Sequence, residues 1–156
     1  MTQIIYIAIL SLGLWFGYIA EKEDRKAYIY FLIVLLTFLA GFRGENCGRD
    51  TPSYYNNIIK GFPYPWMLRE EGFRAMATFF MNRFKNPQLL FVSCAFITNC
   101  LILKRLWDFR KEANYSFMVL IYVLLYYSNS MNIMRQYVAV AFIFYGTRYF
   151  KKNKIF

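Results

Sequence analysis

Histidine is absent from this sequence of 156 residues, and cysteine occurs only three times. Cys47 lies in a polar stretch, Cys94 and Cys100 lie in an apolar one, and no Cys-x-x-Cys pair occurs. Zinc sites are built from clustered Cys and His ligands, so the sequence offers no adequate ligand set for zinc. The commonest general base is missing as well. Any catalysis must therefore use carboxylates, tyrosines or arginines, and we expect neither a metal nor another cofactor.

Charged residues are nearly absent from several long stretches, although the formal net charge is +10 and 58% of the residues are hydrophobic. A membrane-spanning helix needs roughly 20 mostly apolar residues, with about 17 tolerated. The first apolar block meets this length outright, and the others reach it with aromatic or snorkelling flanks. We therefore predict an all-α, polytopic transmembrane fold. The single membrane domain, residues 1–156, has about five helices, at residues 2–20, 27–42, 89–106, 115–133 and 136–150.

The first block also lacks the features of a cleaved signal peptide. Its opening residues, MTQ, contain no Lys or Arg, and no small-x-small cleavage pattern precedes the sequence EKEDRK. We interpret this block as a membrane helix that the protein retains.

Basic residues gather in the connections between the apolar blocks and predict the orientation of the helices. Three clusters follow the first, third and fifth predicted helices: Lys22, Arg25 and Lys26; Lys104, Arg105, Arg110 and Lys111; Lys151, Lys152 and Lys154. Cytoplasmic loops of membrane proteins carry an excess of Lys and Arg, so these clusters are predicted to face the cytoplasm. The N-terminus and the loop at residues 43–88 then lie outside, and the C-terminal end is cytoplasmic. We expect the charges to meet membrane lipids and no nucleic acid.

The long outer loop contains two further predicted helices. Asp50 or Thr51 can cap a short helix that starts at Pro52. Farther along, apolar residues recur at helical spacing on one face while the other face is polar: Phe73, Ala77, Phe80 and Phe84 against Arg74, Asn82 and Arg83. This pattern predicts an amphipathic helix that lies on the outer membrane–water interface or dips into it.

Two arginines mark the outer ends of apolar segments: Arg43 follows the second segment, and Arg135 lies in the turn NSMNIMRQ. Arginine near the hydrocarbon boundary is costly to bury and therefore needs a partner. Two such side chains that converge on one outer cavity would bind a dianion through bidentate hydrogen bonds. Asp50 can act there as a base or orient an arginine, and Tyr54 supplies a ring and a hydroxyl suited to a sugar or a phosphate. The predicted ligand is a phosphorylated amphiphile whose tail occupies the membrane.

Simpler roles for the same residues stay open. Arg43 and Arg135 can snorkel to lipid phosphates without binding a specific ligand. Arg49 can pair with a neighbouring carboxylate such as Asp50. Tyr54 can belong to the belt of aromatic residues that is common at membrane interfaces.

Three motifs, in order, resemble the EpsG family of bacterial exopolysaccharide polymerases, which are relatives of the Wzy-type polymerases. FRGENCGRDTPSYYN resembles the Arg-x-x-x-x-Gly-x-Asp-x-x-x-Tyr signature, EEGF resembles the Glu-x-Gly-Phe element, and NIMRQYVAVAF resembles the Asn-x-x-Arg-Gln-x-x-Ala helix start. Their order and approximate spacing agree over essentially the whole chain. Arg49 departs from the pattern, because the family more often has a small residue there.

The resemblance implies a glycosyltransferase that polymerises undecaprenyl-pyrophosphate-linked oligosaccharide repeat units into exopolysaccharide or capsule. The reaction would take place on the outer face of the bacterial cytoplasmic (inner) membrane. Arg43 and Arg135 would stabilise the charge on the leaving pyrophosphate, and Asp50 or Glu71 would accept the proton of the acceptor hydroxyl. Further substrate contacts are implied for residues at or beside the matching motifs: Arg49, Tyr54, Glu71, Asn132 and Gln136. Other membrane proteins of polysaccharide assembly would be partners.

Members of that family are longer chains with more helices, so these 156 residues are expected to be the N-terminal part of a longer protein. The resemblance leaves open whether they are active alone. Two other functions also stay open: a transporter of lipid-linked sugars, and a non-catalytic membrane component of polysaccharide biosynthesis. A transporter would need polar residues along several helices. The predicted helix interiors offer few of them: Thr37, Ser93, Thr98 and Asn99.

Overall fold

The computed structural model describes residues 2–44, 50–59 and 71–150. Every regular element in these ranges is helical, so the prediction of an all-α chain is confirmed. The elements are α1 (Thr2–Glu23), α2 (Lys26–Gly41), α3 (Thr51–Ile59), α4 (Glu71–Phe84), α5 (Gln88–Asp108), α6 (Tyr115–Ile121), the π-helical segment η2 (Tyr122–Tyr127), α7 (Ser128–Asn132) and α8 (Met134–Phe150).

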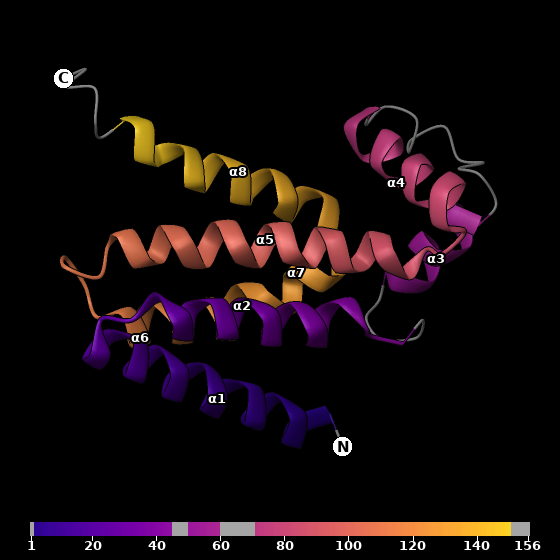
Figure 1. Cartoon of the computed structure of the whole chain (residues 1–156). Helices are drawn as coiled ribbons and strands as arrows, with labels where there is room; N and C mark the ends of the chain where they lie inside the picture. Colours follow the sequence, from indigo (N-terminus) through magenta and orange to yellow (C-terminus); the bar gives the residue numbers. More distant parts are fainter. Residues whose placement is uncertain (1, 45–49, 60–70, 151–156) are drawn as a thin grey trace.

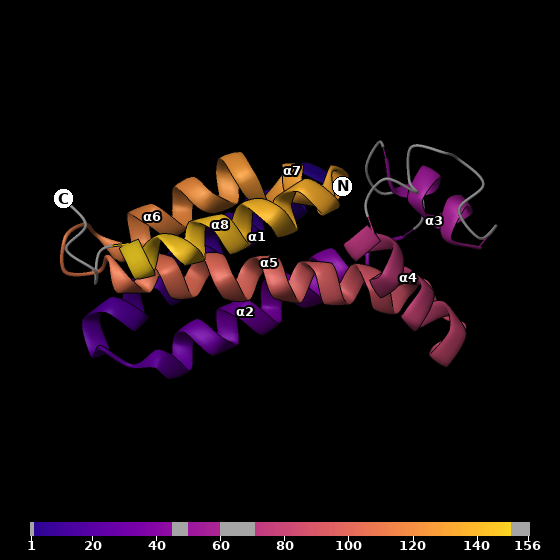
Figure 2. The ribbon, with the colours of Figure 1, turned by 90° about the horizontal axis from the view of Figure 1, so that it is seen from above.

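The long helices run back and forth along a common direction (Figure 1). α1 runs away from the end of the molecule that carries α3 and α4, α2 returns to it, and α5 runs away again. The continuous segment α6–η2–α7 returns once more, and α8 leads away toward the C-terminus. α5 packs against α2 and α8, whereas α1 packs against α2 and α6. Figure 2 shows α2 on one side of α5 and α6, α7 and α8 on the other.

Among the described helices, α5 is the one that is long and apolar enough to cross a membrane, and α2 is a shorter apolar helix. At 1.5 Å per residue, the 21 residues of α5 span about 31 Å and the 16 residues of α2 about 24 Å. The hydrocarbon layer is about 30 Å thick. Within the described ranges, one of the five predicted membrane helices passes the combined test of length and apolar composition, so the prediction of five membrane spans is not confirmed.

Small residues bring α1 close to α6. Gly13 and Gly17 lie one turn apart on α1, and a methyl group on Gly17 would come within 3.2 Å of the Ser116 Cα atom. This is the small-xxx-small arrangement that lets membrane helices approach closely. At the end of α1, a carboxylate oxygen of Glu21 accepts hydrogen bonds from the Ser116 backbone N–H and hydroxyl, both at 3.3 Å. A carboxylate at the N-terminus of α6 is favourably placed in the field of that helix.

Polar groups inside the bundle bond one another. The Tyr122 hydroxyl donates to Asn99 Oδ1 at 2.7 Å, and Asn99 Nδ2 lies 3.5 Å from Thr37 Oγ1. The Tyr127 hydroxyl donates to the Leu36 carbonyl at 2.7 Å. These contacts tie α2, α5 and η2 together. Thr37 and Asn99 therefore serve helix packing in this structure.

Two segments differ in detail from the expected helices. The turn predicted at NSMNIMRQ is mostly helical, because only Ile133 separates α7 from α8. The π-helical segment η2 was not predicted, since a π-helix widens the turn without any clear signal in the residue pattern. The remaining bounds lie near the expected ones. In the predicted loop at residues 43–88, α4 buries Phe73 and Ala77, as its pattern predicts, but leaves Phe84 exposed.

Candidate functional site at the α3–α4 end of the bundle

Arg43 follows the end of α2, and its side chain is 8% exposed. Its guanidinium group donates to three oxygens: Nε to Thr51 Oγ1 at 3.2 Å, one terminal nitrogen to the Ala40 carbonyl at 3.1 Å, and the other to the Met131 carbonyl at 2.8 Å. The guanidinium carbon also lies 4.9 Å from the centre of the Phe91 ring. Arg43 thus joins α2 to α3, to α7 and to α5. A buried charge needs such a set of partners.

Gln88, the first residue of α5, supports the same corner. Its side-chain amide donates to the carbonyl of Gly41 and, at 3.3 Å, to the carbonyl of Arg43. Gly41 lies where α2 meets α5: a methyl group there would be 2.9 Å from the Val92 Cα atom. The end of α2 is therefore held against α5 by backbone contact and by the Gln88 amide.

Arg135 lies in the first turn of α8, and its side chain is half-buried. Its Nε donates to the Tyr54 hydroxyl at 3.0 Å. The guanidinium carbon lies 5.5 Å from the centre of the Tyr54 ring and 5.8 Å from that of Phe73, distances at which a cation is attracted to an aromatic face. Tyr54 itself is 4% exposed. Arg135 thus contacts α3 and α4 from the start of α8.

The two arginines therefore contact the same short helix but border different spaces. Arg43 bonds Thr51 and Arg135 bonds Tyr54, both residues of α3. The space beside Arg43 has a volume of only about 10 Å³, too small for a ligand. Among the described residues, the two guanidinium groups line separate spaces. The carbonyls of Ala40 and Met131 and the Thr51 hydroxyl hold the Arg43 group inside the protein.

Arg135 lies at a larger apolar groove between α4, α5 and α8. The groove has a volume of about 600 Å³. Two polar residues, Arg135 and Gln136, lie among mostly apolar lining residues: Gly72, Phe73, Met76, Ile97, Val138, Ala139 and Phe142. The N-terminus of α8 lies at the same place, and helix N-termini favour anions. A cation and a helix N-terminus beside an apolar groove can bind an amphiphile with an anionic head.

The other predicted site residues take different places. Asp50 is half-buried directly before α3, and its carbonyl accepts the backbone N–H of Tyr54 at 3.0 Å. Glu71 is exposed at the start of α4 and borders a second, open face of that helix with Arg74 and Arg83.

The last predicted residues lie on the α7–α8 segment or outside the described part. Asn132 is half-buried at the end of α7, and Gln136 is exposed at the groove. Arg49 lies outside the described residues.

Four residues that contact Arg43 or Arg135 were not predicted as site residues from the sequence: Thr51, Phe73, Gln88 and Met131. Thr51 was considered only as a helix cap, and Phe73 only as an apolar face residue. Gln88 could have been identified from the sequence, because a lone amide at the start of an apolar helix needs hydrogen-bond partners. Met131 contributes its carbonyl, and no side-chain pattern can reveal such a role.

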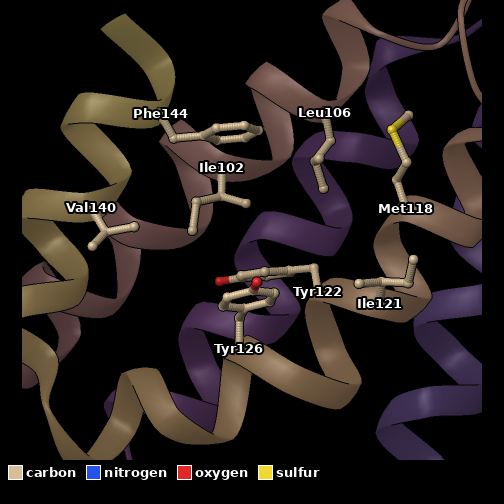
Figure 3. Close-up of a pocket in the computed structure, with 8 residues that line it drawn as sticks. All are labelled: Ile102, Leu106, Met118, Ile121, Tyr122, Tyr126, Val140 and Phe144. Atoms are coloured by element: carbon tan, nitrogen blue, oxygen red, sulfur yellow. The ribbon is translucent and has the colours of Figure 1, made fainter. Parts of the chain in front are cut away.

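A second cavity lies between α5, α6, η2 and α8 (Figure 3). It has a volume of about 280 Å³, and its lining is mostly apolar: Ile102, Leu106, Met118, Ile121, Tyr122, Tyr126, Val140 and Phe144. The Tyr122 hydroxyl is already bonded to Asn99. The lining of this cavity therefore offers few polar groups for binding or catalysis.

Comparison with known protein families finds a match. The model of the EpsG family matches residues 26–156, a range that contains all three motifs and both arginines. This match confirms the family resemblance predicted from the motifs. No curated protein and no solved structure matches the chain.

Proposed function

This chain belongs to the EpsG family, and from that premise we propose that it polymerises lipid-linked sugar repeat units on the outer face of the bacterial cytoplasmic membrane. Membership of the family suggests a polysaccharide-polymerase-like role in exopolysaccharide biosynthesis. The proposed substrate is an oligosaccharide linked to undecaprenyl pyrophosphate. The observation that carries this choice is Arg135, a cation at the head of an apolar groove.

The surface of the bundle supports placing all five long segments in the membrane. Large apolar side chains are exposed on each of them, and Ile143 on α8 is 71% exposed. Others include Trp15, Phe31, Val34, Phe38, Phe96, Phe117, Leu125 and Phe142. In water, extended apolar surfaces of this kind are rare unless a partner covers them. Lipid would cover them here.

The ends of the helices support the proposed orientation. The turn after α1 and the turn after α5 lie at the same end of the bundle (Figure 1), and Arg110 joins them through an ion pair with Asp24, with 3.0 Å between Nε and Oδ1. Both turns carry basic clusters, which favours a cytoplasmic location. α3, α4 and Arg135 lie at the opposite end, which is then the outer face.

In the proposed reaction, Arg135 binds the pyrophosphate that links the growing glycan to its lipid. The lipid chain adjacent to the pyrophosphate lies in the groove between α4, α5 and α8. Charge grows on the pyrophosphate as its bond to the glycan breaks, and the guanidinium group stabilises that charge. The planar guanidinium can bond two phosphate oxygens together, which an ammonium cannot do in the same way.

The acceptor is a hydroxyl group on the sugar of a new lipid-linked unit. Its oxygen bonds to the anomeric carbon of the growing glycan while undecaprenyl pyrophosphate leaves with the bonding electrons. Asp50 accepts the proton of the hydroxyl. We favour Asp50 over Glu71 because Asp50 directly precedes the helix that both arginines contact, whereas Glu71 borders the other face of α4.

Arg43 acts as a positioning residue in this proposal. Its buried contacts hold α3 against the ends of α2 and α7, and α3 supplies Tyr54 to Arg135. Arg43 thus shapes the site without contacting the substrate.

The test uses a strain deleted for the gene that encodes this chain. If the chain is the polymerase, the deletion should abolish long polymer and leave single lipid-linked repeat units on the outer leaflet. Their sugars can be detected there with an oxidant that does not cross the membrane. Complementation with the Asp50→Asn variant should leave activity reduced roughly 10²- to 10⁴-fold, the usual contribution of a general base. The matched Glu71→Gln variant should restore polymer.

Other outcomes would contradict the proposal. Repeat units trapped on the inner leaflet would point to a transporter. If polymer still forms after the deletion and only its export or its length changes, the chain would be a non-catalytic component. Full activity of the Asp50→Asn variant together with loss in the Glu71→Gln variant would move the base to α4.

A further inference from the structure

A polar pocket lies at the end of the bundle opposite to Arg135. It is formed where α2 begins and where α5 and α8 end, and its volume is about 250 Å³. Its lining combines cations, one carboxylate and aromatic rings: Lys26, Ile29, Tyr30, Lys104, Trp107, Asp108, Tyr145 and Arg148. The pocket thus differs from both apolar spaces described above.

Positive charge is in excess in this pocket. Asp108 is its one lining carboxylate, and that group is shared by Arg105 and Arg148, each with a nitrogen 3.5 Å from Oδ2. Lys104 Nζ lies 5.6 Å from the centre of the Tyr30 ring. Within the described ranges neither Lys26 nor Lys104 forms an ion pair with a carboxylate. Like charges held close together repel, so an anion between them would be stabilising.

A second feature of the pocket is its aromatic lining, which includes Trp107. The indole N–H of Trp107 is buried and has no acceptor among the residues that the structure describes. Trp107, Tyr30 and Tyr145 all line the pocket. Tryptophan and tyrosine gather at the level of lipid headgroups in membrane proteins, so the lining fits that depth.

We propose that this pocket binds the phosphate of an anionic phospholipid in the cytoplasmic leaflet. The phosphate oxygens accept hydrogen bonds from Lys26, Lys104 and Arg148. Val34, exposed one turn beyond Tyr30 on α2, offers apolar surface to an acyl chain. Basic pockets between membrane helices on the cytoplasmic side bind acidic headgroups by this chemistry. The inference rests on the proposed membrane location and orientation, and it is independent of the polymerase reaction.

The experiment measures lipid binding by the full chain purified in detergent. Phosphatidylglycerol, phosphatidylcholine or inorganic phosphate is titrated, and retained lipid is counted by native mass spectrometry while the melting temperature is followed. Phosphatidylglycerol should bind and raise the melting temperature more than phosphatidylcholine. In the Lys26→Gln/Lys104→Gln variant its apparent affinity should fall roughly 10- to 30-fold, given about 1 kcal/mol per lysine.

The Lys22→Gln/Lys111→Gln variant is the matched control. It removes two exposed lysines from the same end of the bundle, outside the pocket, and should bind phosphatidylglycerol like the parent. The Lys26→Arg/Lys104→Arg variant keeps the charge and should restore binding, which separates charge from misfolding. Equal loss in the control, equal binding of both lipids, or displacement of the lipid by millimolar phosphate would overturn the proposal. Polymer formation is not the readout, so failure here leaves the proposed reaction untouched.

Discussion

The Nε atom of Arg135 lies 3.0 Å from the hydroxyl oxygen of Tyr54, although 81 positions separate the two residues in the chain. Their contact joins the first turn of α8 to the short helix α3. It also fixes the direction of the guanidinium group at the groove between α4, α5 and α8. The ring of Tyr54 is buried in a hydrophobic cluster that includes Phe73 and Met134. Packing therefore holds the partner of Arg135 in place at this candidate site.

Removal of the Tyr54 hydroxyl should weaken the support of Arg135 without abolishing the aromatic contact. In the Tyr54→Phe variant the ring still faces Arg135, but the hydrogen bond is lost. A hydrogen bond to a charged group contributes about 1.5–3 kcal/mol, so polymer formation in membranes should fall roughly 10- to 100-fold. The Tyr55→Phe variant changes the neighbouring tyrosine and should keep most of the activity. Equal losses in both variants would contradict the role given to Tyr54.

Arg43→Lys should affect folding more than substrate binding. A lysine ammonium cannot reach the carbonyls of Ala40 and Met131 and the Thr51 hydroxyl in the geometry of the guanidinium fork. The lost buried bonds should lower the free energy of unfolding by about 1–3 kcal/mol, measured by thermal or SDS-induced unfolding in micelles. Any polymerase activity that remains should keep the parent's apparent KM. A stable variant with a raised KM would instead place Arg43 in contact with substrate.

Gly41→Ala tests the close contact between α2 and α5. The added methyl group would lie 2.9 Å from the Val92 Cα atom, so the helix ends must separate and strain the corner that holds Arg43. We expect a lower melting temperature and a loss of polymer. Gly146→Ala on α8 is the control, because its added methyl group has no packing neighbour within 4 Å outside the local helix backbone. That variant should be neutral or slightly stabilising, since alanine favours helix.

The proposed orientation is tested by cysteine labelling in intact spheroplasts. Cys47 belongs to the loop that is proposed to lie outside, and it is not among the described residues. In a protein with Cys94→Ala and Cys100→Ala, an impermeant thiol reagent should label Cys47 without permeabilisation. A second protein, with Cys47→Ala and Lys111→Cys added, should be labelled only after permeabilisation. The reverse pattern would invert the bundle and place Arg135 on the cytoplasmic side.

Much of the helical architecture follows from local pattern in the sequence. The apolar blocks predict the long helices, and the spacing of Phe73 and Ala77 predicts the buried face of α4. The family motifs singled out Arg43, Arg135, Asp50 and Tyr54, and all four take part in the hydrogen-bonded contacts around α3.

The separate environments of the two arginines could not be predicted from the sequence. The burial of Arg43 depends on a carbonyl oxygen of Met131, 88 positions away, and backbone acceptors leave no trace in residue identity. The π-helical segment η2 likewise depends on how Tyr122 and Tyr127 pack against α5 and α2. Both features arise from tertiary contacts between distant segments.

The most direct test of the proposed function is the length distribution of surface polysaccharide made by the Arg135→Lys variant in the deletion strain. Lysine keeps the charge but cannot grip two pyrophosphate oxygens as the guanidinium does. Loss of such a transition-state contact typically costs roughly 10²- to 10³-fold in rate. We predict short or absent polymer, with the variant present in the membrane at the parent's level. Full-length polymer from Arg135→Lys would contradict pyrophosphate binding by Arg135.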